Sequence, residues 1–197
     1  MMEYSNPNFL ICTFFGVSKI FKKFPGTIGS LIGIPVAYFI NSLSSALLTK
    51  TPLEAFDSYL LHFMMPLFLV SILFLVGVYA SKQYIAACGK SDPGEIIIDE
   101  IASQTLCILV TLPMTFALIY DNLAEKIVLY YDIVFLLSIF MNVALFRFFD
   151  IFKPWPIRYF DQTLKGGFGV MFDDLLAAIF SIVVYFAILF VIIDFYK

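Results

Sequence analysis

The stretch LLAAIFSIVVYFAILFVII, residues 175–193, decides the fold, because it carries no charged residue and is long enough to cross a bilayer. A helix of about 20 apolar residues spans the hydrocarbon core of a membrane. Of the 197 residues, 61% are hydrophobic and only 14% are charged, and the mean hydropathy is +0.95. Soluble domains carry more charge, so the composition indicates a one-domain integral membrane protein. It excludes an ordinary cytosolic enzyme, a disordered chain and a nucleic-acid-binding protein.

Four further segments are apolar enough to be spans: residues 30–48, 63–80, 101–120 and 128–149. The first of these contains Pro35 and Asn41, so a tilted or interfacial helix is an alternative there. Residues 9–24 mix apolar side chains with lysines, which is typical of a helix on the membrane surface. We predict an all-α, polytopic membrane helical bundle with four to five spans and interfacial helices. It forms a single domain over residues 1–197, in which residues 1–24 are an interfacial N-terminal segment.

The basic residues indicate how this bundle is oriented. With five spans, nine of the 12 lysines and arginines fall on the side that holds the N-terminus: Lys19, Lys22, Lys23, Lys82, Lys90, Arg147, Lys153, Arg158 and Lys165. The positive-inside rule makes that side cytoplasmic. Four polar segments, residues 25–30, 91–100, 147–161 and 165–174, fall on the same side. We expect them to assemble a site at the cytoplasmic surface of the membrane.

Acidic residues are concentrated in these polar segments: Asp99, Glu100, Asp150, Asp173 and Asp174. Carboxylates close to an apolar boundary repel one another unless a cation lies between them, and Mg²⁺ prefers oxygen ligands. The alternative is that the acids only cap helix N-termini, where the helix dipole favours negative charge. Because two acidic pairs and Asp150 share one face, we favour a catalytic Mg²⁺ site built from these five residues.

Basic residues and glycines in the same segments could bind an anion. Arg147, Lys153, Arg158 and Lys165 surround the rigid run Lys-Pro-Trp-Pro-Ile-Arg at 153–158, and arginine and lysine pair with phosphate oxygens. The runs PGTIGS at 25–30, which includes Thr27, and GGFG at 166–169 could present backbone N–H groups at a helix start. Attraction to lipid headgroups explains the cations equally well, and ordinary tight turns explain the glycines.

Several common phosphatase mechanisms lack their residues in this sequence. The single histidine, His62, falls on the opposite side of the membrane from the polar segments. No C-x5-R loop, D-x-D-x-T motif, phosphate-binding P-loop or nucleophile elbow is present. The chemistry that remains is metal-assisted hydrolysis of a phosphate ester, in which the basic residues stabilise the developing charge.

Four motifs resemble the phosphatidylglycerophosphatase A family. They are GTIGS at 26–30, DPGEIIIDE at 92–100, FRFFDIFKPWPIR at 146–158 and GGFGVMFDD at 166–174, in the family's order. The resemblance implies an all-helical, Mg²⁺-dependent lipid phosphatase of the bacterial inner membrane. Such an enzyme hydrolyses phosphatidylglycerophosphate to phosphatidylglycerol and phosphate, a step of glycerophospholipid biosynthesis. The functional positions that the resemblance implies are Asp99, Glu100, Arg147, Asp150, Lys153, Asp173 and Asp174, with Asp92, Thr27 and Arg158 as further positions.

The sequence departs from the family pattern at two positions. Lys165 stands where many members have histidine, a change that a phosphate-binding role tolerates, and Ser103 stands where glycine is frequent. We expect a phospholipid substrate as the partner, with no nucleic acid and no obligate protein partner. The alternative function is a small membrane transporter or channel whose acidic cluster binds a cation. A transporter would need charges deep within several spans, and Asp132 is the one acid placed to enter a span. A third option, a purely structural membrane subunit, gives no reason for four motifs to converge.

Overall fold

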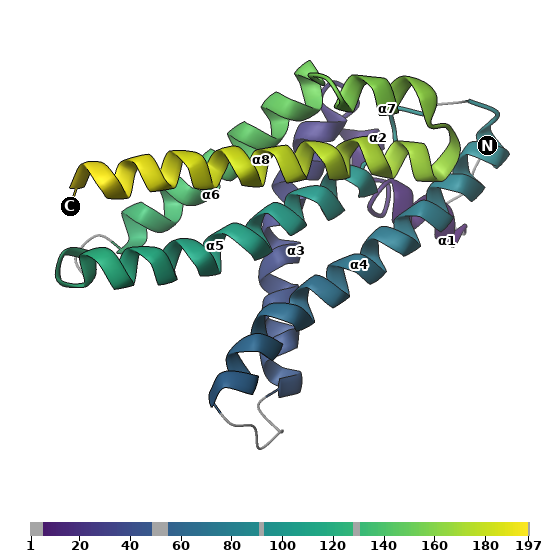
Figure 1. Cartoon of the computed structure of the whole chain (residues 1–197). Helices are drawn as coiled ribbons and strands as arrows, with labels where there is room; N and C mark the ends of the chain where they lie inside the picture. The colour runs from purple at the N-terminus through teal and green to yellow at the C-terminus, as the bar shows by residue number, and fades with distance from the viewer. Residues whose placement is uncertain (1–5, 49–54, 91–92, 128–130, 197) are drawn as a thin grey trace.

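The computed structural model describes residues 6–48, 55–90, 93–127 and 131–196, and this part of the chain is helical with no strand (Figure 1). Three helices are short: α1 (Pro7–Cys12), α2 (Val17–Ile20) and α7 (Ile157–Thr163). Five are long: α3 (Pro25–Leu48), α4 (Ala55–Cys88), α5 (Ile98–Ile127), α6 (Tyr131–Phe152) and α8 (Gly166–Tyr196). Each long helix contains a stretch long and apolar enough to cross a membrane. The predicted all-α, polytopic fold is confirmed, with five spans.

Two of the long helices, α3 and α8, begin well before the hydropathy pattern predicts. α3 begins at Pro25 instead of residue 30, and α8 begins at Gly166 instead of residue 175. Hydropathy placed the polar motifs in loops ahead of the spans, and that expectation is wrong. Proline suits the first turn of a helix, and the glycines that follow are needed where these helices contact their neighbours. The motifs therefore form the first turns of the membrane helices.

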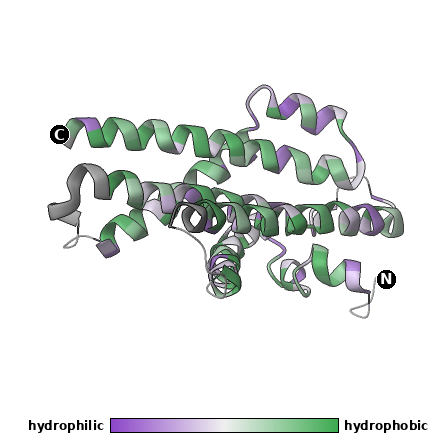
Figure 2. Ribbon diagram, turned by 60° about the horizontal axis from the view of Figure 1, so that its bottom comes forward, coloured by the Kyte–Doolittle hydropathy of each residue, from purple (hydrophilic) through white to green (hydrophobic). Residues whose placement is uncertain are grey.

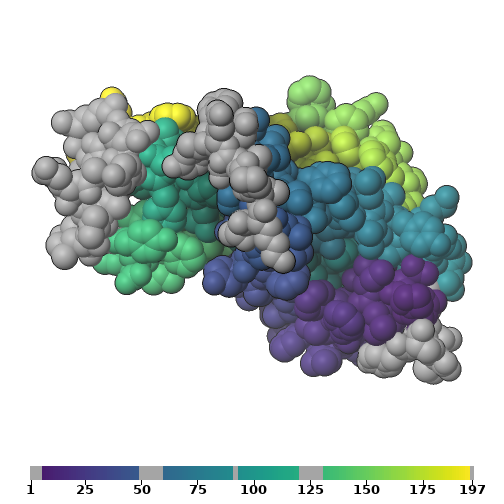
Figure 3. All heavy atoms as spheres, turned by 90° about the horizontal axis from the view of Figure 1, so that it is seen from below, coloured from purple at the N-terminus to yellow at the C-terminus, as the bar shows by residue number. Residues whose placement is uncertain are grey.

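The N-terminal segment is two short helices instead of one surface helix. Residues 14–16, between α1 and α2, all have positive φ, a conformation that only glycine adopts without strain. The reversal lets α1 pack on the end of α4, where Phe9 stacks on Tyr84 with ring centroids 6.3 Å apart. In Figure 3 this purple segment lies against the blue α4. That these helices lie in the membrane interface stays a prediction.

α5 is the central helix of the bundle. The most apolar window of this span is 56% buried, the largest share among the five. Its neighbour α3 approaches very closely: a Cβ on Gly33 would lie 2.8 Å from the Cβ of Gln104, and Thr105 donates a hydrogen bond to the Gly33 carbonyl. Small residues allow such close contact between membrane helices. In Figure 1, α8 runs beside α5, while α3 and α4 diverge from this pair.

Neutral polar side chains join α5 to α6 and α8 inside the bundle. Thr111 donates a hydrogen bond of 3.0 Å to Asn142, and the hydroxyls of Thr115 and Tyr185 lie 2.8 Å apart. Interhelical bonds of this kind contribute about 0.6 kcal/mol each in a membrane protein. Figure 2 shows that the long helices are mostly hydrophobic, with hydrophilic residues in α7 and in the first half of α8. Most of the charged residues in the described segments lie at this end of the bundle, with Asp132 and Asp194 at the other.

Candidate active site

A cavity of about 570 Å³ lies where the starts of α3, α5 and α8 meet the end of α6. The four polar segments converge here, as the topology predicts. The lining includes nine of the ten predicted site residues: Thr27, Asp99, Glu100, Arg147, Asp150, Lys153, Lys165, Asp173 and Asp174. The tenth, Arg158, lies on the exposed face of α7 and does not line the cavity. Asp92 lies outside the described residues.

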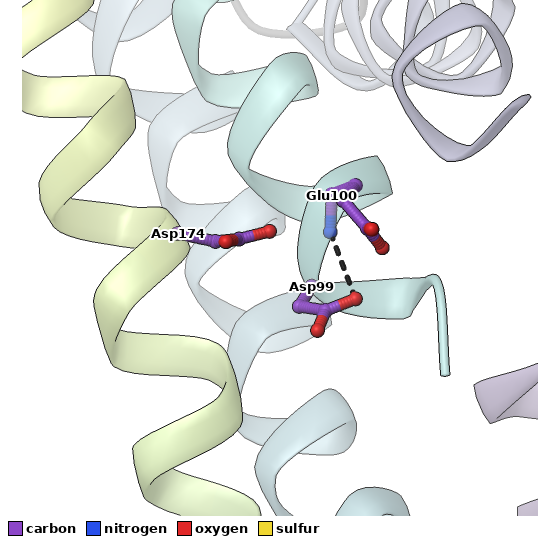
Figure 4. A group of neighbouring side chains, drawn as sticks. All are labelled: Asp99, Glu100 and Asp174. Carbon is purple, nitrogen blue, oxygen red and sulfur yellow. Dashed lines mark hydrogen bonds between the residues drawn. The ribbon is translucent and has the colours of Figure 1, made fainter. Parts of the chain in front are cut away.

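Three carboxylates from two helices face one another in the cavity. Asp99 and Glu100 come from the first turn of α5, and Asp174 comes from α8 and points toward them (Figure 4). One oxygen of each lies within 4.8 Å of the other two. The Glu100 backbone N–H donates a 3.0 Å hydrogen bond to Asp99, which ties the two α5 residues together. Asp99, Glu100 and Asp174 are therefore the residues that could hold a metal ion.

These carboxylates have more acceptor capacity than their neighbours use. Glu100 Oε2, Asp174 Oδ2 and Asp173 Oδ1 are buried and receive no hydrogen bond from the described residues. Asp99 and Asp174 are only 8% and 5% exposed. A buried carboxylate without a partner is costly, and each such group requires an explanation. A divalent cation bound between them would satisfy these oxygens, which is the chemistry that this donor set fits.

Arg147 and Asp150 form a second group beside the acidic cluster. Arg147 Nη1 donates to Asp150 Oδ2 at 2.5 Å, and both side chains are largely buried. The start of α3 touches this group at Gly26: a Cβ there would overlap Glu100 Oε1 and lie 2.8 Å from Arg147 Nη1. Glycine at this position therefore allows the guanidinium, the Glu100 carboxylate and the N-terminus of α3 to approach one another. Asp150 already pairs with a basic side chain, whereas the ion pairs of the described residues include none of the three clustered carboxylates.

Lys153 forms a third group that connects α6, α7 and α8. Its ammonium donates hydrogen bonds to Asp161, at 2.7 Å, and to Asp173. Burial alone would lower the pKa of Lys153, but the bonds to the two carboxylates outweigh it and raise this pKa above its ordinary value. Burial likewise opposes ionisation of Asp161, yet the bond to Lys153 lowers the pKa of Asp161 below its ordinary value. Lys153 is therefore held as a fixed positive charge in the cavity wall.

Asp161 is a cavity residue that the sequence reasoning did not single out. It lies within the polar segment 147–161, but its partner Lys153 is eight positions earlier, and their contact depends on how α7 folds back. The only signal in the sequence is the pair of prolines at 154 and 156, which end α6 and turn the chain. Lys23 also lines the cavity, although its segment was predicted to lie on the membrane surface.

The two glycine motifs have structural roles at the cavity. Gly166 has a φ of +76° where α8 begins. A Cβ on Gly167 would overlap the backbone of Val78 and Lys82, so this glycine lets α8 pack directly on α4. The first turns of α3 and α8 both line the cavity, and their free N–H groups make each start a favourable place for an anion. Close packing and anion binding are both compatible with these motifs.

Comparison with known proteins agrees with this arrangement. Residues 10–189 match the family described as Phosphatidylglycerophosphatase A. A protein of that name from Haemophilus influenzae is 36% identical over 93% of this chain and 89% of its own length. One from Escherichia coli K12 is 30% identical over 91% of this chain and 82% of its own length. A Bacteroides thetaiotaomicron protein, provisionally named a phosphatidylinositol-3-phosphatase, is 28% identical over 88% of each chain.

No solved structure matches the chain. The match extends over all four motifs that form the cavity, so the relatives and the geometry identify the same part of the molecule. With that coverage and that identity, the chain belongs to the phosphatidylglycerophosphatase A family, a family of phosphatase enzymes.

Proposed function

We propose that this protein removes the terminal phosphate of phosphatidylglycerophosphate, giving phosphatidylglycerol and phosphate for glycerophospholipid biosynthesis. One observation carries the proposal: a cavity at one end of a bundle with five spanning-length helices combines clustered carboxylates with basic side chains. A lipid phosphate monoester needs this combination, because its phosphate is anionic while its acyl chains stay in the bilayer. The names of the Haemophilus and Escherichia relatives support the choice of substrate.

We further propose that the reaction depends on Mg²⁺, held by Asp99, Glu100 and Asp174. The unpartnered oxygens of this cluster support the assignment, because Mg²⁺ takes carboxylate oxygens as ligands and keeps several waters. When bound, the ion would polarise a phosphoryl oxygen and lower the pKa of a water ligand. Asp150 and Asp173, also predicted as ligands, each bond to a basic side chain, which favours a role in orienting Arg147 and Lys153.

Basic groups around the cavity would bind the phosphate. Arg147 offers a guanidinium fork that matches two phosphate oxygens, and Lys153 and Lys165 add positive charge from other sides. The N-terminal N–H groups of α3, next to Thr27, lie on the same wall and favour an anion. Because these donors are fixed by the helices before the substrate arrives, they would stabilise charge that develops on the phosphoryl group. Arg158, exposed outside the cavity, has no part in this proposal.

We propose that the cavity opens on the cytoplasmic face of the bacterial inner membrane. The excess of lysine and arginine at this end of the bundle supports that orientation. The headgroup would enter the cavity from the interface, while the lipid tails remain in the bilayer beside the spans. The low charge content of the chain fits this arrangement, because only the headgroup site needs charge.

No observation favours a transporter or channel. In the described parts of the five spans, the charged residues lie near the helix ends, and Asp132 is next to the start of α6. The buried polar residues farther along the helices, such as Thr111 and Asn142, are neutral and hydrogen-bonded to each other. A transport path for a cation would need acidic or other strong ligands along the bundle interior.

The test is phosphate release by the purified protein in detergent micelles. The substrates are phosphatidylglycerophosphate, phosphatidylinositol 3-phosphate and, as a negative control, phosphatidylglycerol, which has no monoester. We expect release from phosphatidylglycerophosphate and a loss of roughly 100-fold in kcat/KM for Asp174→Asn, since a group that stabilises developing charge contributes this much. The matched control is Asp194→Asn, an exposed acid near the far end of α8, which we expect to keep full activity. The proposal would be overturned if wild type preferred the inositol lipid or released no phosphate from phosphatidylglycerophosphate.

A further inference from the structure

A second cavity, of about 550 Å³, lies in the bundle between α3 and α6 and is also lined by residues of α4 and α5. Its lining is mainly apolar. The principal contributors are Ile34 and Tyr38 from α3, Ile108 and Leu112 from α5, and Phe135 and Ile139 from α6. Polar side chains gather at one end, where Asn41 and His62 line it. In Figure 1, α3 and α6 come together near the active-site end and diverge away from it.

The apolar cavity is in register with the active-site cavity along all three helices. On α3, Thr27 lines the first and Ile34 the second, and residues seven apart share a helix face. On α5, Glu100 and Ile108 stand eight apart, which also places them on one face. The same holds on α6 for Arg147 and Ile139, again eight apart. The apolar cavity therefore lies deeper in the bundle than the active-site cavity, along the same sides of α3, α5 and α6.

The boundary between the two cavities is itself polar. Gln104 lies one turn from Glu100 and one turn from Ile108 on the same face of α5, packed against Gly33. Its side chain is fully buried, and both of its amide atoms lack a hydrogen-bond partner among the described residues. From the active-site cavity inward, the side chains on these helices thus change from charged, through the neutral and polar Gln104, to the apolar lining that precedes Asn41 and His62. The polarity of a phospholipid changes in the same order, from its phosphate, through its glycerol and esters, to its acyl chain.

The dimensions agree with a single acyl chain. At about 1.5 Å per residue, the stretch of α3 from Ile34 to Ser45 that lines the apolar cavity is about 16 Å long. One leaflet of a bilayer has a hydrocarbon depth of about 15 Å, half of a core of about 30 Å. The interval from Thr27 to Ile34 is about 10 Å, which is the distance that the glycerol part of the lipid would have to bridge between the two cavities.

We propose that the apolar cavity between α3 and α6 binds an acyl chain of the lipid substrate whose headgroup lies in the active site. This inference rests on the proposed function and adds to it a subsite that distinguishes long-chain from short-chain lipids. A chain bound there removes apolar surface from contact with bulk lipid and fixes the direction of approach of the headgroup. Filling the cavity therefore raises KM for long-chain substrates and leaves the chemistry at the phosphate unchanged.

The test compares two substrates, palmitoyl and hexanoyl phosphatidylglycerophosphate, on wild type and on variants of α3 and α6. Ile139→Trp fills the cavity, and Ile34→Trp fills it from the opposite wall. Leu136→Trp is the matched control, because Leu136 is also on α6 but is 65% exposed and outside the cavity lining. We expect both cavity variants to raise KM for the palmitoyl substrate about 10-fold, equivalent to about 1.4 kcal/mol. We expect kcat for the hexanoyl substrate to stay within about two-fold of wild type, which also shows that the variants are folded.

The outcomes separate this inference from the proposed function. If wild type releases phosphate from neither lipid, the proposed function fails and takes the subsite with it. If wild type hydrolyses both lipids but the cavity variants match Leu136→Trp on both, the proposed function stands and the acyl-chain subsite is wrong. If the cavity variants change the oligomeric state in detergent and lose activity equally on both lipids, the cavity is an interface between copies of the chain and the subsite is again wrong.

Discussion

Lys153 is the residue that connects the separate parts of the site. It ends α6 with a φ of +42°, a left-handed conformation that costs a non-glycine residue about 1 kcal/mol. From this position its ammonium reaches both Asp161 and Asp173. The conformation that ends the helix is thus also the one that places the charge in the cavity. The strained residue, Lys153, therefore lies where the site is assembled.

Replacing the Lys153 ammonium therefore has two consequences. In Lys153→Met, Asp173 loses its partner and the cavity loses a fixed positive charge, so we expect kcat/KM for phosphatidylglycerophosphate to fall roughly 100-fold. Lys90→Met is the control, since Lys90 is exposed, lies outside the cavity lining and pairs with Glu95 at 3.8 Å on the surface. Phosphate-release kinetics on both variants check this. Equal activity of the two variants would remove Lys153 from the site.

At the scale of the helices, the glycines decide how the site is held together. Gly26 places the start of α3 against Glu100 and Arg147, and Gly33 brings α3 into contact with α5 at Gln104. Gly167 does the same for α8 against α4. The helices that carry Glu100 and Asp174 are thus positioned by close contacts at these glycines, with side chains at Gly26 and Gly33 and with the α4 backbone at Gly167. Any side chain at these points displaces a helix and its carboxylate together.

Gly167→Ala tests the packing role of the glycine motif. Because its Cβ would overlap the α4 backbone, we expect a loss of about 1–3 kcal/mol in stability, seen as a lower Tm in detergent. Gly94→Ala is the matched control, because no atom lies within 4 Å of the Cβ that it adds. An unchanged Tm for Gly167→Ala would show that α8 does not depend on this contact.

The sequence allowed the elements to be predicted better than their boundaries. Uncharged apolar runs such as residues 175–193 predict spans directly, and the structure contains a helix at each predicted span. The starts of α3 and α8 were missed, because polar and glycine-rich residues read as loops when their packing partners are unknown. The carboxylates were predicted from their clustering in motifs. The bond between Lys153 and Asp161 could not be predicted, since it depends on how the chain turns between α6 and α7.

At the scale of the whole molecule, the alternation of the five spans places all four motifs at one end. The starts of α3, α5 and α8 and the end of α6 therefore share a membrane face, and the C-terminal end of α8 lies on the other. The charge of a sparsely charged chain is concentrated where a headgroup would be bound. The apolar remainder of the bundle forms both the membrane anchor and the apolar cavity between α3 and α6.

Cysteine accessibility tests this topology. In a Cys88→Ser background, where the remaining Cys12 and Cys107 are buried, Tyr159→Cys reports on α7 and Asp194→Cys on the far end of α8. Because the positive-inside rule places α7 in the cytoplasm, a membrane-impermeant maleimide should label position 194 from outside and position 159 only after lysis. Labelling of position 159 from outside would place the site on the opposite face.

The central claim is that clustered carboxylates hold a Mg²⁺ ion that hydrolysis of the lipid phosphate requires, and a Mg²⁺ titration of phosphate release tests it most directly. The measurement uses purified protein stripped with EDTA and compares wild type with Glu100→Gln. Wild type should regain activity with saturable dependence on Mg²⁺. The variant, which loses one charged ligand, should need roughly 10- to 100-fold more Mg²⁺ for half-maximal rate. Full activity of the stripped wild type, or an identical Mg²⁺ requirement in Glu100→Gln, would contradict the account.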